Sequence, residues 1–288
     1  MKLFSTLFLS FLFIINVQAQ KKPAYKLYNA KGKKTSYKKL LKQAKKADVV
    51  LFGEFHNNPI SHWLQYEFTK DMNEKRKLVL GFEMLESDNQ NEINSYLEGK
   101  INQKALDTLA RLWGNYKTDY KPLVDFAKDN KLDVCACNVP RRYASMVFKG
   151  GFEALDTLPN KEKDWIAPLP FPYDATLASY VAMTNMEHMN HMPEKMKQNM
   201  PKAQAIKDAT MAHFILENLK KRHLMIHYNG AYHSNDYEGI MWYLKKYRPE
   251  LKILTITTES VSDVKKFNKE NAKADFIIQV DENMTSTY

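Results

Sequence analysis

Glycine is scarce in this sequence. Nine glycines stand among 288 residues, where average usage of roughly 7% predicts about twenty. None of them forms the G-x-G-x-x-G or G-x-x-x-x-G-K-[ST] pattern, so the phosphate-binding loops of dinucleotide-binding and P-loop folds are absent. The G-x-S-x-G nucleophile elbow is also missing. These absences exclude the most recognisable nucleotide-binding and serine-hydrolase sites.

Cysteine is scarcer still, because the chain has only Cys135 and Cys137. In a β-strand, residues two apart point to the same face but are poorly placed for a disulfide. We therefore expect two buried free thiols.

Long hydrophobic runs are absent apart from the segment 3–17. That run is too short to span a bilayer, which takes ~20 apolar residues, and it follows Lys2 and precedes Val17-Gln18-Ala19. This pattern predicts a signal peptide over residues 1–19, with cleavage after Ala19 or Gln20, and a mature domain over 20–288. No cysteine stands near the cleavage site to form a lipobox. We expect an exported protein, periplasmic or associated with the outer membrane, without a transmembrane helix.

Acidic residues are fewer than basic ones, with 33 Asp and Glu against 43 Lys and Arg. Many lysines gather between Lys21 and Lys46, ahead of the first predicted strand. We interpret them as the solvated face of a short helix near Tyr37 to Ala47. Contact with anionic lipid headgroups or an acidic ligand is the alternative, and nucleic acid is not an expected partner of an exported protein.

Short β-branched runs alternate with helical periods along the rest of the chain, which is typical of an α/β fold with a largely parallel central sheet flanked by helices. The predicted strands are Asp48–Glu54, Lys77–Glu83, Leu132–Cys137, Leu224–Tyr228, Lys252–Thr257 and Asp275–Val280. The predicted helices between the first of these strands lie near 60–75, 89–98, 102–112 and 119–129.

The interval from Pro140 to Arg222 breaks this alternation. It is too long for a simple connection, so we predict a helical subdomain over about 140–222, inserted before the fourth strand. Pro193 and Pro201 stand where first-turn prolines would begin new helices.

Polar side chains follow four of the predicted strands at the point where each strand ends. They are Glu54, His56, Glu83, Asn138, Arg141, Asn229 and His233. Ligands of open parallel sheets bind beyond the carboxyl ends of the strands, so this edge is the predicted pocket. Glu54, His56, Glu83 and His233 could bind a divalent metal such as Zn²⁺ or Mn²⁺, or supply an acid/base group. A structural alternative is a buried network in which Arg141 and Arg142 neutralise Glu54 and Glu83.

The insertion is rich in methionine and also carries two histidines. The residues are Met183, Met186, Met189, Met192, Met196 and Met200, with His188 and His191 among them. Their spacing of three to four is helical and is equally typical of a packed core stripe. An adaptable apolar surface with imidazoles also suits a flat hydrophobic ligand, and phenols such as Tyr173 and Tyr180 could ligate ferric iron.

Five ordered motifs resemble those of the ChaN-like haem-binding family, in the Tiki/erythromycin-esterase/PrgY superfamily. They are Gly53-Glu54-Phe55-His56, Gly81-Phe82-Glu83-Met84, Asn138-Val139-Pro140-Arg141, His188 to Pro193 followed by Gln204, Asp208 and Ala212, and Asn229-Gly230-Ala231-Tyr232-His233. The resemblance implies a haem-binding protein of bacterial iron and haem uptake. It also implies a homodimer around paired haems and an outer-membrane haem receptor as partner.

Two functions therefore compete, beside a third possibility, an exported protein that binds another flat apolar ligand. The first is a haem carrier whose candidate haem-binding residues are His188, His191, Met192, Tyr173 and Tyr180, with Arg141 and Arg142 at the propionates. The second is a divalent-metal-dependent hydrolase, of the Tiki-like peptidase or esterase kind, in which Glu54, His56, Glu83 and His233 hold the ion. We favour the carrier, because the resemblance includes the insertion.

Overall fold

The computed structural model describes residues 22–185 and 192–288. Its strands form one seven-stranded sheet in the order β1-β7-β6-β2-β5-β3-β4. The strands are β1 (Tyr25–Asn29), β2 (Val49–Glu54), β3 (Leu78–Glu86), β4 (Asp133–Asn138), β5 (Leu224–Gly230), β6 (Ile253–Val261) and β7 (Phe276–Asp281). Neighbours pair in parallel except β1 with β7. The predicted fold class is confirmed, whereas the predicted signal peptide over 1–19 lies outside the described residues.

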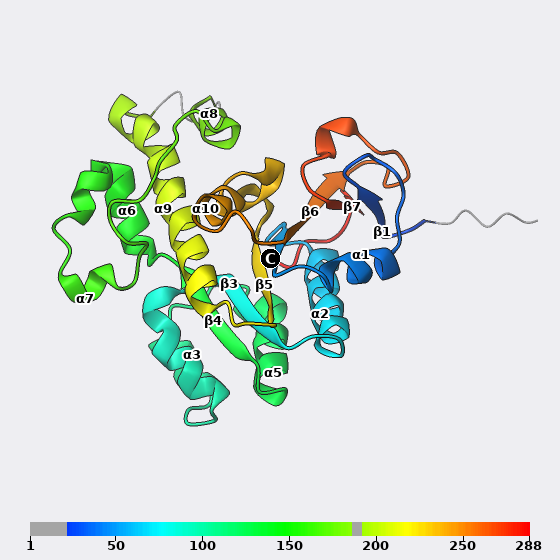
Figure 1. Ribbon diagram of the computed structural model, residues 1–288, viewed down its shortest axis with the longest axis horizontal. Helices are drawn as coiled ribbons and strands as arrows, with labels where there is room; N and C mark the ends of the chain where they lie inside the picture. Colours follow the sequence, from blue (N-terminus) through cyan, green and yellow to red (C-terminus); the bar gives the residue numbers. More distant parts are fainter. Residues whose placement is uncertain (1–21, 186–191) are drawn as a thin grey trace, which may run out of the picture.

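Helices connect the strands (Figure 1). They are α1 (Tyr37–Ala44), α2 (Pro59–Asn73), α3 (Gln90–Leu97), α4 (Gln103–Leu109), α5 (Lys121–Asp129), α6 (Arg141–Gly150), α7 (Asn160–Lys163), α8 (Ala178–Thr184), α9 (Glu194–Asn218) and α10 (Ile240–Tyr247). Shorter helical segments are η1 (Ser87–Asn89), the π-turn η2 (Tyr116–Tyr120), η3 (Phe152–Leu155), η5 (Ala231–His233), η6 (Asn235–Tyr237) and η7 (Lys269–Asn271). None of the described helices is long and apolar enough to cross a bilayer.

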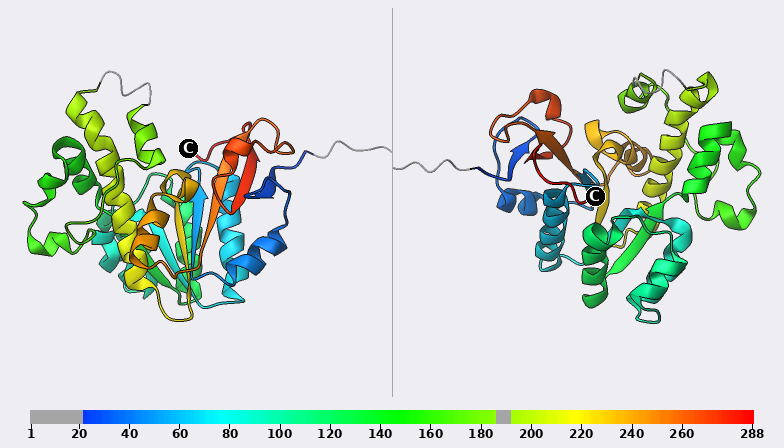
Figure 2. Two further views of the ribbon diagram at one scale, coloured as in Figure 1. Left: turned by 45° about the horizontal axis from the view of Figure 1, so that its top comes forward. Right: turned by 180° about the vertical axis from the view of Figure 1, so that it is seen from behind.

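The sheet is buried on both faces, because alternate side chains of each strand meet different helices. Val50 and Phe52 of β2 join a core with α1, α2 and α5, while Val49 and Leu51 join a second core with α9 and α10. Figure 2 shows α1 and α2 on one side of the sheet and α9 on the other. Burial on both faces explains why β2 and β3 are continuous apolar runs in the sequence.

The connection from β4 to β5 contains helices and no strand in its described part, residues 139–185 and 192–223. α6, η3 and part of α9 enclose a third small core around Tyr143 and Ile206. Pro193 caps α9 as expected, but the prediction for Pro201 was wrong, because this residue lies inside α9. A proline inside a helix lacks the backbone N–H that would donate to the preceding turn. The Pro201 side chain is buried.

The lysine-rich N-terminal segment was predicted without a strand, yet it contains β1. Leu27 and Tyr28 of β1 are buried, and the strand pairs antiparallel with β7 at the edge of the sheet. Lysines on an edge strand are a common protection against further strand pairing. In α1 the lysines Lys38, Lys39 and Lys42 are exposed, as expected for a solvated face.

Cys135 and Cys137 are buried free thiols on β4, as predicted. Their Sγ atoms lie 3.1 Å apart without a bond between them.

Candidate functional site

The strands β2, β5, β3 and β4 are neighbours in the sheet, so their carboxyl ends meet at one edge. Glu54, Glu83 and Asn138 belong to strands that end there, and His56, Arg141 and His233 stand two or three residues beyond strand ends. The structure therefore brings together all six predicted pocket residues, and His56, Glu83, Asn138, Arg141 and His233 line one cavity.

Glu54 and His56 form a hydrogen-bonded pair whose carboxylate is fully buried. Glu54 also accepts hydrogen bonds from Gln65 Nε2 at 2.5 Å and from the Tyr120 hydroxyl at 2.7 Å. Because an ionised carboxylate only accepts, the bond of 2.9 Å to His56 Nδ1 places the proton on Nδ1. In the neutral imidazole, Nε2 then carries the free lone pair.

Burial and the neighbouring carboxylates shift the pKa of His56 in opposite directions. Burial lowers the pKa of His56, but the Glu54 and Glu83 carboxylates more than offset this, and the pKa is raised above its ordinary value.

His233 is held between two buried carboxylates. Its Nε2 lies 3.1 Å from Glu83 Oε1, and its Nδ1 lies 2.5 Å from Asp208 Oδ1. Burial lowers the pKa of His233, but Glu83 and Asp208 outweigh it and the pKa rises to about 9. Glu83 also accepts the Gly230 backbone N–H at 2.6 Å, and its pKa is lowered mainly by His233 against the effect of burial. The Tyr180 hydroxyl donates to the other oxygen of Asp208 at 2.9 Å.

These contacts bear on the predicted metal ligands. Both nitrogens of His233 lie within hydrogen-bond distance of carboxylate oxygens, so a metal at either nitrogen would have to displace one of these contacts. Glu54 is likewise occupied by three donors. Within residues 22–185 and 192–288, no group of three or more His, Cys, Asp or Glu side chains is arranged to hold a metal ion.

A second set of hydrogen bonds fixes the backbone at His56. The His56 carbonyl accepts from His62 Nε2 at 3.1 Å and from Asn115 Nδ2 at 2.9 Å. Asn115 also donates to Asp119 at 2.7 Å, and Asp119 accepts the Thr287 hydroxyl at 2.8 Å. The chain end near Thr287 thus helps to hold the turn that carries His56.

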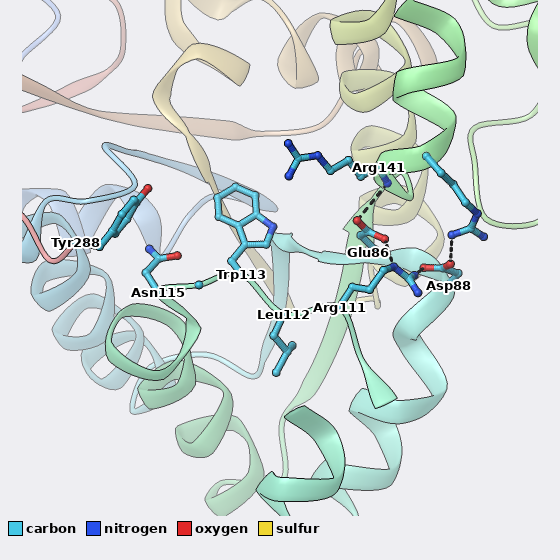
Figure 3. A pocket seen from close by; sticks show the side chains of 10 residues that line it. Glu86, Asp88, Arg111, Leu112, Trp113, Asn115, Arg141 and Tyr288 are labelled. Carbon is cyan, nitrogen blue, oxygen red and sulfur yellow. Dashed lines mark hydrogen bonds and ion pairs between the residues drawn. The ribbon is translucent and has the colours of Figure 1, made fainter. Parts of the chain in front are cut away.

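Three cavities adjoin one another at this edge. The inner cavity, of about 350 Å³, is lined by His56, Glu83, Glu86, Trp113, Asn138, Val139, Arg141, Lys207 and His233. The methionine cavity, of about 440 Å³, shares His56 and His233 and adds Phe55, Met183, Met200 and Tyr232. The arginine cavity, of about 1080 Å³, shares Glu86, Trp113 and Arg141 with the inner cavity and adds Arg111, Arg142 and Tyr288. In Figure 3 the Arg141 side chain extends toward the Trp113 ring.

The predicted pairing of the arginines was wrong. Arg142 pairs with Asp88 at 2.6 Å, and the Arg141 backbone N–H donates to Glu86 at 3.1 Å. Glu54 and Glu83 are neutralised by histidines instead, because these stand on adjacent strand exits whereas the arginines begin α6. Figure 3 shows Glu86 beside Arg141.

The insertion contributes some of the residues that were predicted to bind a flat apolar ligand. Met183 and Met200 line the methionine cavity, Met192 is half-buried before α9, and Tyr173 stacks on Tyr180 with ring centroids 5.8 Å apart. Tyr180 is bonded to Asp208, and burial raises its pKa. The predicted ligands His188 and His191 lie outside the described residues.

Sequence reasoning gave no role at the site to several residues that build it, although Gln204 and Asp208 stand in one of the motifs that it quoted. On α9, Gln204, Lys207 and Asp208 follow the i, i+3, i+4 spacing of one helix face, a signal that was readable. On α2, His62 and Gln65 have the same three-residue spacing. Tyr120 offered no such signal, because only the tertiary structure brings it to Glu54.

Comparison with known proteins agrees with this architecture. A family model described as haem-binding uptake, Tiki superfamily, ChaN, matches residues 40–244. Among solved structures, the chain resembles ChaN of Campylobacter jejuni, reported with cofacial haem binding, at a TM-score of 0.68 and 18% identity over 88% of this chain and 96% of that one. A Bacillus cereus protein matches at a TM-score of 0.50 and 14% identity over 85% of this chain and 90% of that one. At these identities the likeness concerns the fold.

A sequence relative among curated proteins is the chloroplastic RETICULATA-RELATED 5 of Arabidopsis thaliana. It is 26% identical over 133 residues, which cover 43% of this chain and 18% of that protein. The chain therefore spans less than a fifth of that relative's length.

Proposed function

We propose that this chain, which belongs to the haem-binding uptake family ChaN of the Tiki superfamily, binds haem in the cavities at the carboxyl edge of its sheet. The observation that carries the proposal is the position of His56, whose Nε2 is left free by the bond from Nδ1 to Glu54. His56 is about one-third exposed and lines both the inner and the methionine cavity.

The residues present fit a haem. Phe55, Met183, Met200 and Tyr232 supply soft and flat apolar surface around the methionine cavity, which suits a planar macrocycle. Burying roughly 400 Å² of ligand surface at about 25 cal/mol per Å² contributes on the order of 10 kcal/mol before ordering costs.

Histidine and tyrosine are the side chains proposed to meet the iron. A carboxylate that accepts from the far nitrogen orients an imidazole ligand and makes it more basic, as Glu54 does for His56. The insertion offers the further candidates His188, His191, Met192, Tyr173 and Tyr180. Of these, Tyr180 would first have to leave Asp208.

Export by the segment 1–19 and a role in bacterial haem or iron uptake complete the proposal. A second copy of the chain and an outer-membrane haem receptor are the proposed protein partners. The signal peptide is tested by the mass of the protein exported from a bacterial host, since cleavage after Ala19 or Gln20 predicts two alternative N-termini.

Haemin titration of the purified chain tests the function. We expect a saturable shift of the Soret band at micromolar protein, weakened tenfold or more in His56→Ala. His223→Ala is the matched control, because His223 stands at the opposite end of β5. Absence of a saturable shift in the unaltered protein would refute the proposal.

Hydrolysis is a second candidate, favoured by the bond between His56 and buried Glu54. Such a pair can take a proton from water at Nε2, and the metal-dependent form would require Glu54, His56, Glu83 and His233 to rearrange around an ion. Elemental analysis and assays on a panel of esters and peptides test it. Stoichiometric zinc or manganese, or turnover lost in His56→Ala, would support this candidate, whereas no metal and no turnover would exclude it.

A further inference from the structure

Lysines dominate one end of the molecule. Residues 22–46 contain ten lysines and no acidic residue, and nine of these lysines are exposed. They lie on β1, on α1 and in the segments beside them, at the β1 edge of the sheet. Figure 1 places β1 and α1 at one end of the molecule and α6 and α7 at the opposite end. We call these ten lysines the lysine surface.

Neighbouring elements do not neutralise the lysine surface. α2 packs against α1, β7 pairs with β1, and Phe267 of the β6–β7 connection packs on Tyr28 with ring centroids 5.0 Å apart. Residues 59–77 and 262–282, which include these elements, contain eight acidic and eight basic residues. Within residues 22–185 and 192–288, the ion pairs that lysines form all involve Lys75 or later lysines. The excess of positive charge therefore stays on the lysine surface.

The stability of α1 does not explain these charges. The helix has no acidic residue in its first turn, where acidic side chains are favourable and cations are not. Lys38 and Lys42 are four residues apart, and like charges at this spacing destabilise a helix. The lysines therefore repel one another in the free protein, and a negatively charged partner would relieve this repulsion.

An exposed tryptophan borders the lysine surface. Trp63 of α2 is 49% exposed, and its ring meets that of Tyr25 of β1 edge-on, with centroids 6.1 Å apart. Tryptophan and tyrosine are enriched where proteins meet the headgroup layer of a membrane. Every cation in residues 1–47 is a lysine, which is a point charge and lacks the planar fork that arginine offers to single carboxylates. A lipid surface therefore fits this end better than an acidic protein does.

We propose that the lysine surface, with Trp63 at its border, docks the protein on a bilayer that contains anionic phospholipids. The lysines attract the negative headgroups over a distance that the ionic strength sets, and Trp63 enters the headgroup layer. In this orientation α6 and α7 point away from the bilayer. The inference does not rest on haem binding, and it is tested without haemin.

Cosedimentation with lipid vesicles tests the docking. The protein is purified after export, and its mass confirms that all variants share one N-terminus. Vesicles of phosphatidylglycerol mixed with phosphatidylcholine should bind it at least about tenfold more tightly than vesicles of phosphatidylcholine alone, and high salt should remove this difference. Binding of neither kind of vesicle would overturn the inference.

Two triple variants locate the binding surface. Lys38→Gln/Lys39→Gln/Lys42→Gln should weaken binding to the mixed vesicles about tenfold or more. The matched control takes three exposed charges from α6, α7 and α9, as Lys149→Gln/Lys161→Gln/Lys195→Gln, and should retain most of the binding. Thermal unfolding checks that both variants are folded. An unchanged affinity in the first variant, or an equal loss in both, would overturn the assignment to the lysine surface.

Tryptophan fluorescence reports on Trp63. Mixed vesicles should shift the emission of the unaltered protein to shorter wavelength, and this shift should be lost in Trp63→Phe. A shift that persists in Trp63→Phe would remove Trp63 from the docking surface. Poly-glutamate tests the other class of partner: if it binds the protein and the mixed vesicles do not, the lysines serve an acidic protein and the lipid inference is wrong.

Discussion

At the scale of single residues, Gly230 and His56 illustrate how closely the site is packed. A Cβ atom at Gly230 would lie 2.8 Å from His56 Nε2 and 2.9 Å from its Cε1. No real Cβ has such contacts, so the imidazole at the end of the side chain would have to move. Because Gly230 has no Cβ, the His56 imidazole can occupy its observed position.

We expect Gly230→Ala to weaken haemin binding tenfold or more, which corresponds to about 1.4 kcal/mol, with little loss of fold. Gly114→Ala is the control, because a Cβ there meets no atom within 4 Å. Haemin titration and thermal unfolding are measured on both variants. An unchanged affinity and spectrum in Gly230→Ala would show that binding does not depend on the position of His56.

The buried His233 imidazolium should make stability depend on pH. Its folded pKa of about 9 exceeds the ordinary 6.5, so its contribution is fully present below pH 6.5 and is lost as the pH rises through about 9. The shift corresponds to about 3 kcal/mol. Glu83 has a lowered pKa, so its contribution is present above about pH 4.5 and is lost as the pH falls further.

Urea unfolding between pH 5 and 10 measures this dependence. The decline in unfolding free energy between pH 7 and 9 should disappear in His233→Gln and persist in His223→Gln. If His233→Gln kept the whole decline, another group would be responsible for it.

At the scale of elements, the segment 285–288 crosses the sheet edge to reach the site. Thr287 donates its backbone N–H to Asn57 at 3.0 Å and its hydroxyl to Asp119, and Figure 1 places the chain end near the middle of the molecule. This segment therefore ties the turn after β2 to the π-turn η2.

We expect Thr287→Val to loosen both turns, because it removes the hydroxyl while keeping the shape. Hydrogen exchange of residues 55–58 and 115–119 should accelerate by about fivefold to tenfold, as expected for the loss of about 1 kcal/mol. Thr287→Ser should restore slow exchange, and exposed Thr285→Val should leave it unchanged. Equal exchange in Thr287→Val and the unaltered chain would contradict this role.

Most elements could be predicted because their signals are local. The apolar runs of β2, β3 and β5 are strong patterns, and the predicted strands begin within one residue of the observed ones. Strand β1 was not predicted because only Leu27 and Tyr28 are buried in an otherwise polar segment. The prediction that a helix begins at Pro201 was wrong because the preference of proline for the first turn describes an isolated helix. Packing on several sides supports α9 around this residue.

At the scale of the whole molecule, apolar side chains are exposed near the methionine cavity. Phe55 and Tyr232 both line this cavity and are more than one-third exposed. Exposed apolar surface around a binding site is typical of an interaction surface, and it supports the proposed dimer around paired haems.

Analytical ultracentrifugation with and without haemin tests that assembly. We expect a dimer with one haem per chain at saturation, weakened at least tenfold by Phe55→Ser. Leu109→Ser is the control, since this residue is exposed at the end of α4. A monomer at saturating haemin would refute the paired arrangement.

The sequence by itself determined the parallel sheet, the helical insertion and the four strand ends that carry the polar residues. The spacing of apolar residues and the type of residue that follows each strand are local properties of the chain. It also supplied the motifs of the family. Only the tertiary structure decided which partner each side chain has: Tyr120 for Glu54, Asp208 for His233, Asp88 for Arg142. These contacts join residues far apart in the chain, and a partner fixed by packing leaves no periodic signal in the sequence.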